Sequence, residues 1–105
     1  MIDKTLLSNG VIQYTFWDFI SAPPVGFIWI IITEGESGKR IALILNMYTA
    51  SWARRKGICR KLIEEINSNC DIVVTASGSL EGGKDFLNNI GFLYHPGIDM
   101  WIYKK

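Results

Sequence analysis

The hydrophobic pattern of the first half of the chain is typical of β-strands. Before Thr49, apolar residues fall in short blocks rich in β-branched and aromatic side chains, with polar or glycine-bearing segments between them. An Asn9-Gly10 pair precedes the first block, and the polar residues 34–39 separate the second block from the third, as in a hairpin. The strands of an antiparallel meander are expected over residues 11–17, 25–33 and 40–48.

The pattern changes to a helical period after Gly57. Apolar side chains recur at three- and four-residue spacing over residues 57–69, and charged side chains fill the opposite side, which predicts an amphipathic helix. The apolar positions are Ile58, Cys59, Leu62, Ile63 and Ile66. Residues 72–76 then form a short continuous apolar run, typical of a strand covered on both faces. Strand, helix and strand over residues 40–76 predict a βαβ unit with two parallel strands.

A second helix and a final strand complete the predicted fold. Residues 84–90 have apolar side chains on one side, and Gly91 is typical of a residue that ends a helix. Residues 98–103 alternate with period two, and their aliphatic face begins at Ile98. The predicted order is β-β-β-α-β-α-β, an α+β fold with a mixed, mostly antiparallel central sheet that contains the βαβ unit.

The composition limits the class of protein. The chain has 105 residues, 49% hydrophobic and 20% charged, so we expect one globular domain over residues 1–105. Its net charge of +1 gives no overall attraction to nucleic acid or to a membrane. The longest apolar run, residues 25–32, is too short to span a bilayer, and the first residues lack a signal-peptide pattern, so we expect a cytoplasmic protein. Cys59 and Cys70 lack metal-site spacing, so we expect no metal and two reduced thiols.

A cluster of basic residues lies at the predicted start of the first helix. Residues 54–61 place five basic side chains around Gly57. The first turn of a helix leaves main-chain N–H groups without intrahelical partners, its dipole adds partial positive charge, and a glycine lets a phosphate approach the main chain. The segment is therefore a candidate polyphosphate site. A charged surface that is exposed to solvent and binds no ligand is an alternative of equal weight. Neither common nucleotide-binding glycine motif is present, which disfavours a nucleoside-triphosphate enzyme.

These residues resemble the GNAT superfamily of acetyl-CoA-dependent N-acetyltransferases. The signature of that family, Gln/Arg-x-x-Gly-x-Gly/Ala, lies between its fourth strand and the following helix. Here it is matched at Arg54 and Gly57, and Cys59 stands where Gly or Ala is usual. Residues 42–49 resemble the fourth strand of the family, and residues 86–92 resemble its FYxxxGF segment. The resemblance begins at the second expected strand and extends to the end of the chain.

The resemblance implies an acyl-CoA N-acyltransferase-like fold and direct attack of a primary amine on the thioester of acetyl-CoA. It implies that main-chain amides of residues 55–60 hold the pyrophosphate. The main chain near residues 47–49 would pair with the pantetheine arm, and one N–H group there would polarise the acetyl carbonyl. A prepositioned donor of this kind contributes about 2.7 to 4 kcal/mol. The expected cofactor-binding residues are Met47, Tyr48, Thr49, Arg54, Arg55, Lys56, Gly57, Ile58, Cys59 and Arg60.

The proton-transfer groups of the family are not matched. Leu87 stands where a tyrosine acid is usual, and Leu80 stands where an asparagine is frequent. The hydroxyl groups that could replace them belong to Tyr48, Tyr94, Ser77 and Ser79. We take Tyr48 and Tyr94 as the candidate catalytic residues, and the spacing does not choose between them.

Two other reactive side chains are expected to have no chemical role. Cys59 lies on the apolar side of the helical pattern, which favours a buried thiol over a nucleophile. His95 stands before Pro96-Gly97 in an expected turn, without a partner for a triad or a second metal ligand, which favours a surface histidine.

The sequence leaves three functions open. The first is an N-acetyltransferase that acts on an amine of a small molecule or a protein. The second is a non-catalytic module of the same fold that binds a protein, favoured by Leu87, Leu80 and the short segment before Val25, where the family usually has two helices. The third, ranked last, is a nucleic-acid binder that uses residues 54–61. Two helices are few for both faces of such a sheet, so we also expect a homodimer.

Overall fold

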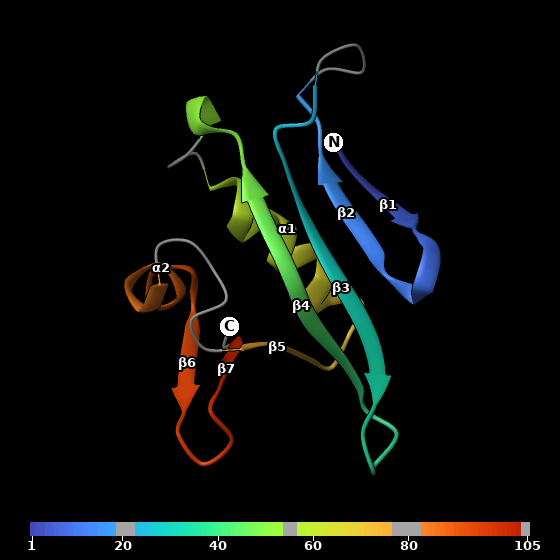
Figure 1. Ribbon diagram of the computed structural model, residues 1–105, viewed down its shortest axis with the longest axis vertical. Helices are drawn as coiled ribbons and strands as arrows, with labels where there is room; N and C mark the ends of the chain where they lie inside the picture. The colour runs from blue at the N-terminus through green and yellow to red at the C-terminus, as the bar shows by residue number, and fades with distance from the viewer. Residues whose placement is uncertain (19–22, 54–56, 77–82, 104–105) are drawn as a thin grey trace.

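The computed structural model describes residues 1–18, 23–53, 57–76 and 83–103, and these residues form one sheet with two α-helices packed on it (Figure 1). The elements are β1 (Ile2–Leu6), β2 (Ile12–Phe16), β3 (Gly26–Glu34), β4 (Arg40–Thr49), α1 (Ile58–Ser68), β5 (Ile72–Ala76), α2 (Gly83–Ile90), β6 (Phe92–His95) and β7 (Met100–Tyr103). Short 3-10 turns at Ser8–Gly10 and Ser51–Ala53 precede β2 and follow β4.

The sheet has the order β1-β2-β3-β4-β5-β7-β6. Strands β4 and β5 pair in parallel, and every other neighbouring pair is antiparallel. This arrangement confirms the predicted α+β fold with a mixed, mostly antiparallel sheet, and it confirms the parallel strands of the βαβ unit.

Two strands were not predicted from the sequence. Strand β1 lies at one edge of the sheet, where only Ile2 is half-buried and the other four residues are exposed. Strand β6 lies at the other edge and has four residues, of which only Phe92 is fully buried. Edge strands of this kind carry little of the hydrophobic alternation on which strand prediction depends.

The last strand is shorter than the sequence predicted. Strand β7 begins at Met100 because residues 96–99 form a turn, in which Asp99 takes the left-handed conformation with φ 51°. Ile98 belongs to that turn and is 62% exposed. Trp101, on the other face of the strand, is the residue that enters the core.

Both helices cover the same face of the sheet. Four of the five predicted apolar positions of α1 are buried, namely Ile58, Leu62, Ile63 and Ile66, and the fifth, Cys59, is half-buried. In α2, Leu87 is buried beside Phe92 and Trp101 in the same core cluster. The guanidinium of Arg60 in α1 donates to the main-chain carbonyl of Asn89 in α2, which ties the two helices together.

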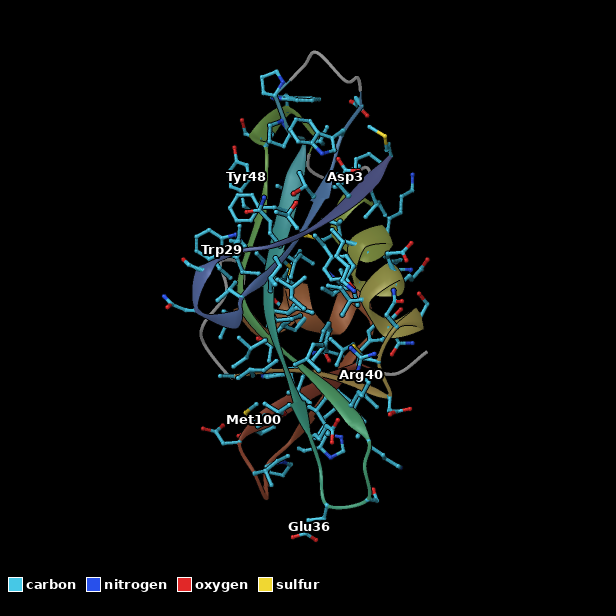
Figure 2. The ribbon with its side chains drawn as sticks, turned by 90° about the vertical axis from the view of Figure 1, so that its right-hand side faces the viewer. Asp3, Trp29, Glu36, Arg40, Tyr48 and Met100 are labelled. Atoms are coloured by element: carbon cyan, nitrogen blue, oxygen red, sulfur yellow. The ribbon has the colours of Figure 1, made fainter. Side chains whose placement is uncertain are left out.

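The opposite face of the sheet carries aromatic side chains and no helix from the described part of the chain. Figure 2 shows Trp29 and Tyr48 on the side of the sheet away from α1. Phe27 lies between them, 5.5 Å from the ring of Trp29 and 5.4 Å from the ring of Tyr48, measured between ring centroids. The described helices therefore leave one face of the sheet uncovered. None of them is long and apolar enough to cross a lipid bilayer.

Candidate functional site

Strand β4 loses its partner on one side half-way along its length. Its pairing with β3 shifts register between Trp29 and Ile30, so that Leu45 is an extra residue on β4 and forms a β-bulge. Its parallel pairing with β5 ends just before the bulge, at Ile44 and Thr75. Beyond the bulge, β4 continues beside β3 alone among the described strands, as the upper part of β4 in Figure 1 illustrates. This half of the strand has an edge, called the open edge below, that no described strand pairs with.

The main chain of Met47 faces that open edge. The N–H of Ala50 donates to the carbonyl of Val25, which directs residue 50 toward the β3 side. Because main-chain groups alternate along a strand, residues 46 and 48 also point toward β3, and Met47 points away from it. The N–H of Met47 donates 2.9 Å to Oδ1 of Asn46, a bond outside the β3 ladder, as this alternation requires.

The first turn of α1 is open at its N-terminal end. Gly57 precedes the helix in the left-handed conformation, with φ 75° and ψ 18°, and as the N-cap residue it makes no side-chain capping hydrogen bond. The first intrahelical bond runs from the Lys61 N–H to the Gly57 carbonyl at 3.0 Å, so the amides of residues 58–60 have no partner one turn earlier within the helix. A Cβ placed on Gly57 would have no atom within 4 Å. The arrangement leaves room for an anion against these amides.

The open edge and the open helix end lie next to each other. Oγ1 of Thr49, at the end of β4, lies 3.1 Å from Sγ of Cys59 in the first turn of α1. Gly26 makes this approach possible, because a Cβ there would lie 2.7 Å from the Tyr48 carbonyl oxygen and 3.3 Å from the Ile58 side chain. The structure thus brings together the predicted positions Met47, Tyr48, Thr49, Gly57, Ile58, Cys59 and Arg60. The predicted positions Arg54, Arg55 and Lys56 lie outside the described residues.

The environment of Cys59 disfavours its nucleophilic thiolate form. Burial raises the pKa of the Cys59 thiol, and the hydrogen bond with Thr49 opposes that shift only in part. A thiol with a raised pKa is protonated at neutral pH, and the thiolate is the nucleophilic form. Cys59 therefore serves to join the end of β4 to the start of α1.

The two candidate catalytic tyrosines lie far apart. Tyr48 is 46% exposed on the uncovered face of the sheet, stacked on Phe27. Tyr94 lies on β6, three strand spacings from β4, which is about 14 Å. Its hydroxyl donates 2.6 Å to Oδ1 of Asp99, and this bond raises the pKa of Tyr94. Of the two hydroxyl groups, only that of Tyr48 belongs to the strand that carries the open edge.

The remaining candidates occupy different positions. Leu87 is 1% exposed in the core, where it packs beside Phe92, so its position serves the fold. The predicted turn follows His95, whose carbonyl accepts from the Ile98 N–H at 3.3 Å. His95 itself ends β6 and is half-buried, so the expectation of a surface histidine was wrong, and its buried Nε2 has no hydrogen-bond partner among the described residues. Ser77, Ser79 and Leu80 fall outside the described residues. No group of three metal-ligating side chains occurs among the residues that are described.

Asn46 is the residue at this site that the sequence analysis missed. It lies opposite Trp29 in the β3–β4 pairing and is exposed, and its carboxamide oxygen is bound to the Met47 N–H. The available signal was a single asparagine inside the apolar run of residues 41–48. A short amide side chain in such a run often bonds to nearby main chain.

Comparisons with solved structures identify proteins of the same architecture. The crystal structure of a probable acetyltransferase matches with a TM-score of 0.67 and 18% identity, over 84% of this chain and 63% of the other. The crystal structure of the NatC complex bound to Gag peptide and CoA matches with a TM-score of 0.60 and 18% identity, over 89% of this chain and 70% of the other. A GNAT-family protein from Bacteroides thetaiotaomicron matches with a TM-score of 0.55 and 15% identity, over 93% of this chain and 64% of the other.

The chain thus spans 63% of the length of the first of these proteins and 64% of the third. No protein-family model and no curated protein matches the sequence. The structural matches extend over most of the present chain. The chain has the fold of the GNAT superfamily of acetyltransferases.

Proposed function

We propose that this chain is an N-acetyltransferase that transfers an acetyl group from acetyl-CoA to a primary amine. The observation that carries the proposal is the contact between Thr49 and Cys59, which holds the open edge of β4 against the open first turn of α1. One half of this arrangement suits an extended, amide-containing arm, and the other half suits a diphosphate. Pantetheine and pyrophosphate occur in that order in coenzyme A.

The residues present fit that ligand. In the proposal, the main-chain amides of Gly57, Ile58, Cys59 and Arg60 hold the diphosphate, and the basic residues Arg54, Arg55 and Lys56, which directly precede Gly57 in the sequence, add positive charge. The open space next to Gly57 and its exposure support this part. The main chain of Met47, Tyr48 and Thr49 pairs with the pantetheine arm, and this part is supported by the edge of β4 at Met47, which no described strand pairs with beyond the bulge. When bound, acetyl-CoA supplies the activated acyl group.

The Met47 N–H is the proposed donor to the acetyl carbonyl oxygen. Amine attack places negative charge on that oxygen, and a fixed donor there stabilises the transition state by about 2.7 to 4 kcal/mol. The raised pKa of Cys59 supports direct attack by the amine without an enzyme-bound intermediate. Tyr48 is the proposed proton-transfer group because it neighbours Met47, and Tyr94 is the weaker candidate because Asp99 holds its hydroxyl.

A non-catalytic binding module is the second candidate function. It is favoured by Leu87, which is buried in the core where the family usually has a tyrosine acid. The uncovered aromatic face formed by Phe27, Trp29 and Tyr48 also favours it, because such faces commonly contact another protein. A second copy of this chain is the proposed occupant of that face. Light scattering at micromolar concentration tests this homodimer, and a monomeric mass would contradict it.

Calorimetry and mass spectrometry test the proposed enzyme. Acetyl-CoA at up to millimolar concentration should bind, and a panel of small amines and peptides should yield acetylated products in repeated turnovers. Binding without turnover on any amine would favour the binding module. Absence of binding would contradict both the cofactor and the reaction.

Thiol protection locates the ligand independently of turnover. In the single-thiol variant Cys70→Ser, acetyl-CoA should slow alkylation of Cys59 several-fold. The matched variant Cys59→Ser leaves Cys70, which follows the far end of α1, and the last helical residue Ser68 is about 14 Å from Cys59 by helix rise. Alkylation of Cys70 should not change with acetyl-CoA, and equal protection of both thiols would contradict the proposed position.

A further inference from the structure

The main-chain donor at the open edge of β4 is occupied by a neighbouring side chain. The N–H of Met47 donates to Oδ1 of Asn46 at 2.9 Å, a normal length for an N–H···O hydrogen bond. The side chain of Met47 packs against the core, so its main chain is held in place. Asn46 is exposed, so its carboxamide can rotate away from the donor without breaking packing.

The carboxamide oxygen of Asn46 takes the position that a bound carbonyl would need. The Met47 N–H points to the open edge of the strand, so any acceptor on that N–H lies along this edge. The oxygen of a carboxamide and that of a thioester are both planar carbonyl acceptors. One N–H cannot give a straight hydrogen bond to both oxygens at once.

We propose that Asn46 is a positioning residue that occupies the Met47 donor when the site is empty and is displaced by the acetyl carbonyl of the substrate. This inference rests on the proposed function and concerns the same site. In the empty protein the bond also covers a donor on an unpaired strand edge, where an exposed N–H invites pairing with another chain. Displacement exchanges one hydrogen bond for another, so Asn46 reduces the preference of the site for an acylated ligand.

The inference predicts a difference between two ligands that share every group except the acetyl. Unacetylated CoA leaves the Asn46 bond intact, and acetyl-CoA must break it. In Asn46→Ala the affinity for acetyl-CoA should rise about three- to tenfold, the range for one ordinary hydrogen bond, and the affinity for CoA should not change. Asn46→Asp places a charged acceptor on the same donor, so it should lower the affinity for acetyl-CoA relative to CoA. Asn88→Ala, which removes an exposed asparagine from α2, is the matched control and should change neither affinity.

Calorimetry with CoA and acetyl-CoA on these four proteins measures the ratio of the two dissociation constants. The ratio is that of the dissociation constant for CoA to the dissociation constant for acetyl-CoA. A ratio that rises in Asn46→Ala and falls in Asn46→Asp supports the inference. An unchanged ratio, with both ligands still bound, overturns the inference and leaves the proposed function standing. Failure of the wild-type protein to bind either ligand overturns the proposed function together with the inference.

Amide NMR gives a second readout that needs no ligand. The Met47 amide proton should shift upfield in Asn46→Ala, because its acceptor is gone, and the other amides of β4 should shift much less. An unchanged Met47 resonance would show that the bond to Asn46 does not form, and this result also overturns the inference.

Discussion

Substitution of Gly57 by alanine separates the two demands that the structure makes on this residue. Gly57 has φ 75°, a left-handed conformation that costs a residue with a Cβ about 1 to 2 kcal/mol. A Cβ at this position meets no atom within 4 Å, so conformational strain is the whole expected cost. For a chain of 105 residues, this corresponds to a melting temperature roughly 5 to 10 °C lower.

Gly38 provides a matched control for that strain. It lies in the β3–β4 turn, far from the first turn of α1, with φ 77° and no atom within 4 Å of a Cβ. Gly38→Ala should therefore lower the melting temperature by the same amount as Gly57→Ala. Gly57→Asn should lose less stability than Gly57→Ala, because asparagine tolerates the left-handed conformation better.

Of the alanine substitutions at Gly57 and Gly38, only that at Gly57 should weaken binding of CoA. A methyl group at the mouth of the helix displaces the diphosphate from an amide, and loss of one hydrogen bond to a charged group lowers affinity about 10- to 100-fold. Calorimetry at a temperature where both variants are folded measures this effect. Equal CoA affinity of Gly57→Ala and Gly38→Ala would refute the proposed diphosphate site, and unchanged melting temperatures would refute the strain argument.

Three further predictions test the packing and the pH response. Gly26→Ala should destabilise the protein by about 1 to 3 kcal/mol and weaken CoA binding, because the added Cβ would lie 2.7 Å from the Tyr48 carbonyl oxygen and must push β4 outward. Denaturant unfolding measures the loss of stability, and calorimetry measures the loss of affinity. Leu62→Ala should cost about 2 to 5 kcal/mol in urea unfolding, because Leu62 is fully buried under the sheet, and a loss within 0.5 kcal/mol would contradict its place in the core. Burial raises the pKa values of Tyr14 and Cys59, so both groups stay neutral in the folded protein where they ionise in the unfolded chain. Stability should therefore be complete below about pH 8.5 and fall as the pH rises through the folded-state pKa values, and Tyr14→Phe should reduce this alkaline loss in urea unfolding compared at pH 7 and pH 10.

The sequence predicts those elements in which buried apolar residues recur at a regular spacing along the chain. Helix α1 has a clear apolar stripe, and each of Leu62, Ile63 and Ile66 is fully buried. Strand β3 is similarly clear, with Ile28 and Ile30 facing the helix. The edge strands β1 and β6 hold their places through main-chain pairing with β2 and β7, and that pairing leaves little trace in residue type.

The site is predictable in its helix and only partly predictable in its strand. The glycine at position 57 and the basic residues around it indicate a helix start suited to an anion. The bulge at Leu45 and the point at which β5 leaves β4 depend on the pairing of distant strands, which no local pattern encodes. The separation of Tyr48 from Tyr94 depends on strand order for the same reason.

The antiparallel pairing of β3 with β4 also has a consequence for the order of folding. The two strands are joined by a short turn, in which the Gly38 N–H donates to the Gly35 carbonyl at 3.0 Å, so their contacts close only a small loop. The parallel pairing of β4 with β5 closes a loop that includes the whole of α1, which is entropically harder and slower. The hairpin that carries the bulge can thus assemble early, and the helix that completes the proposed ligand site docks onto it in a later step. Substitutions in the Gly35–Gly38 turn should consequently slow refolding, whereas substitutions at the Thr49–Cys59 contact should chiefly accelerate unfolding.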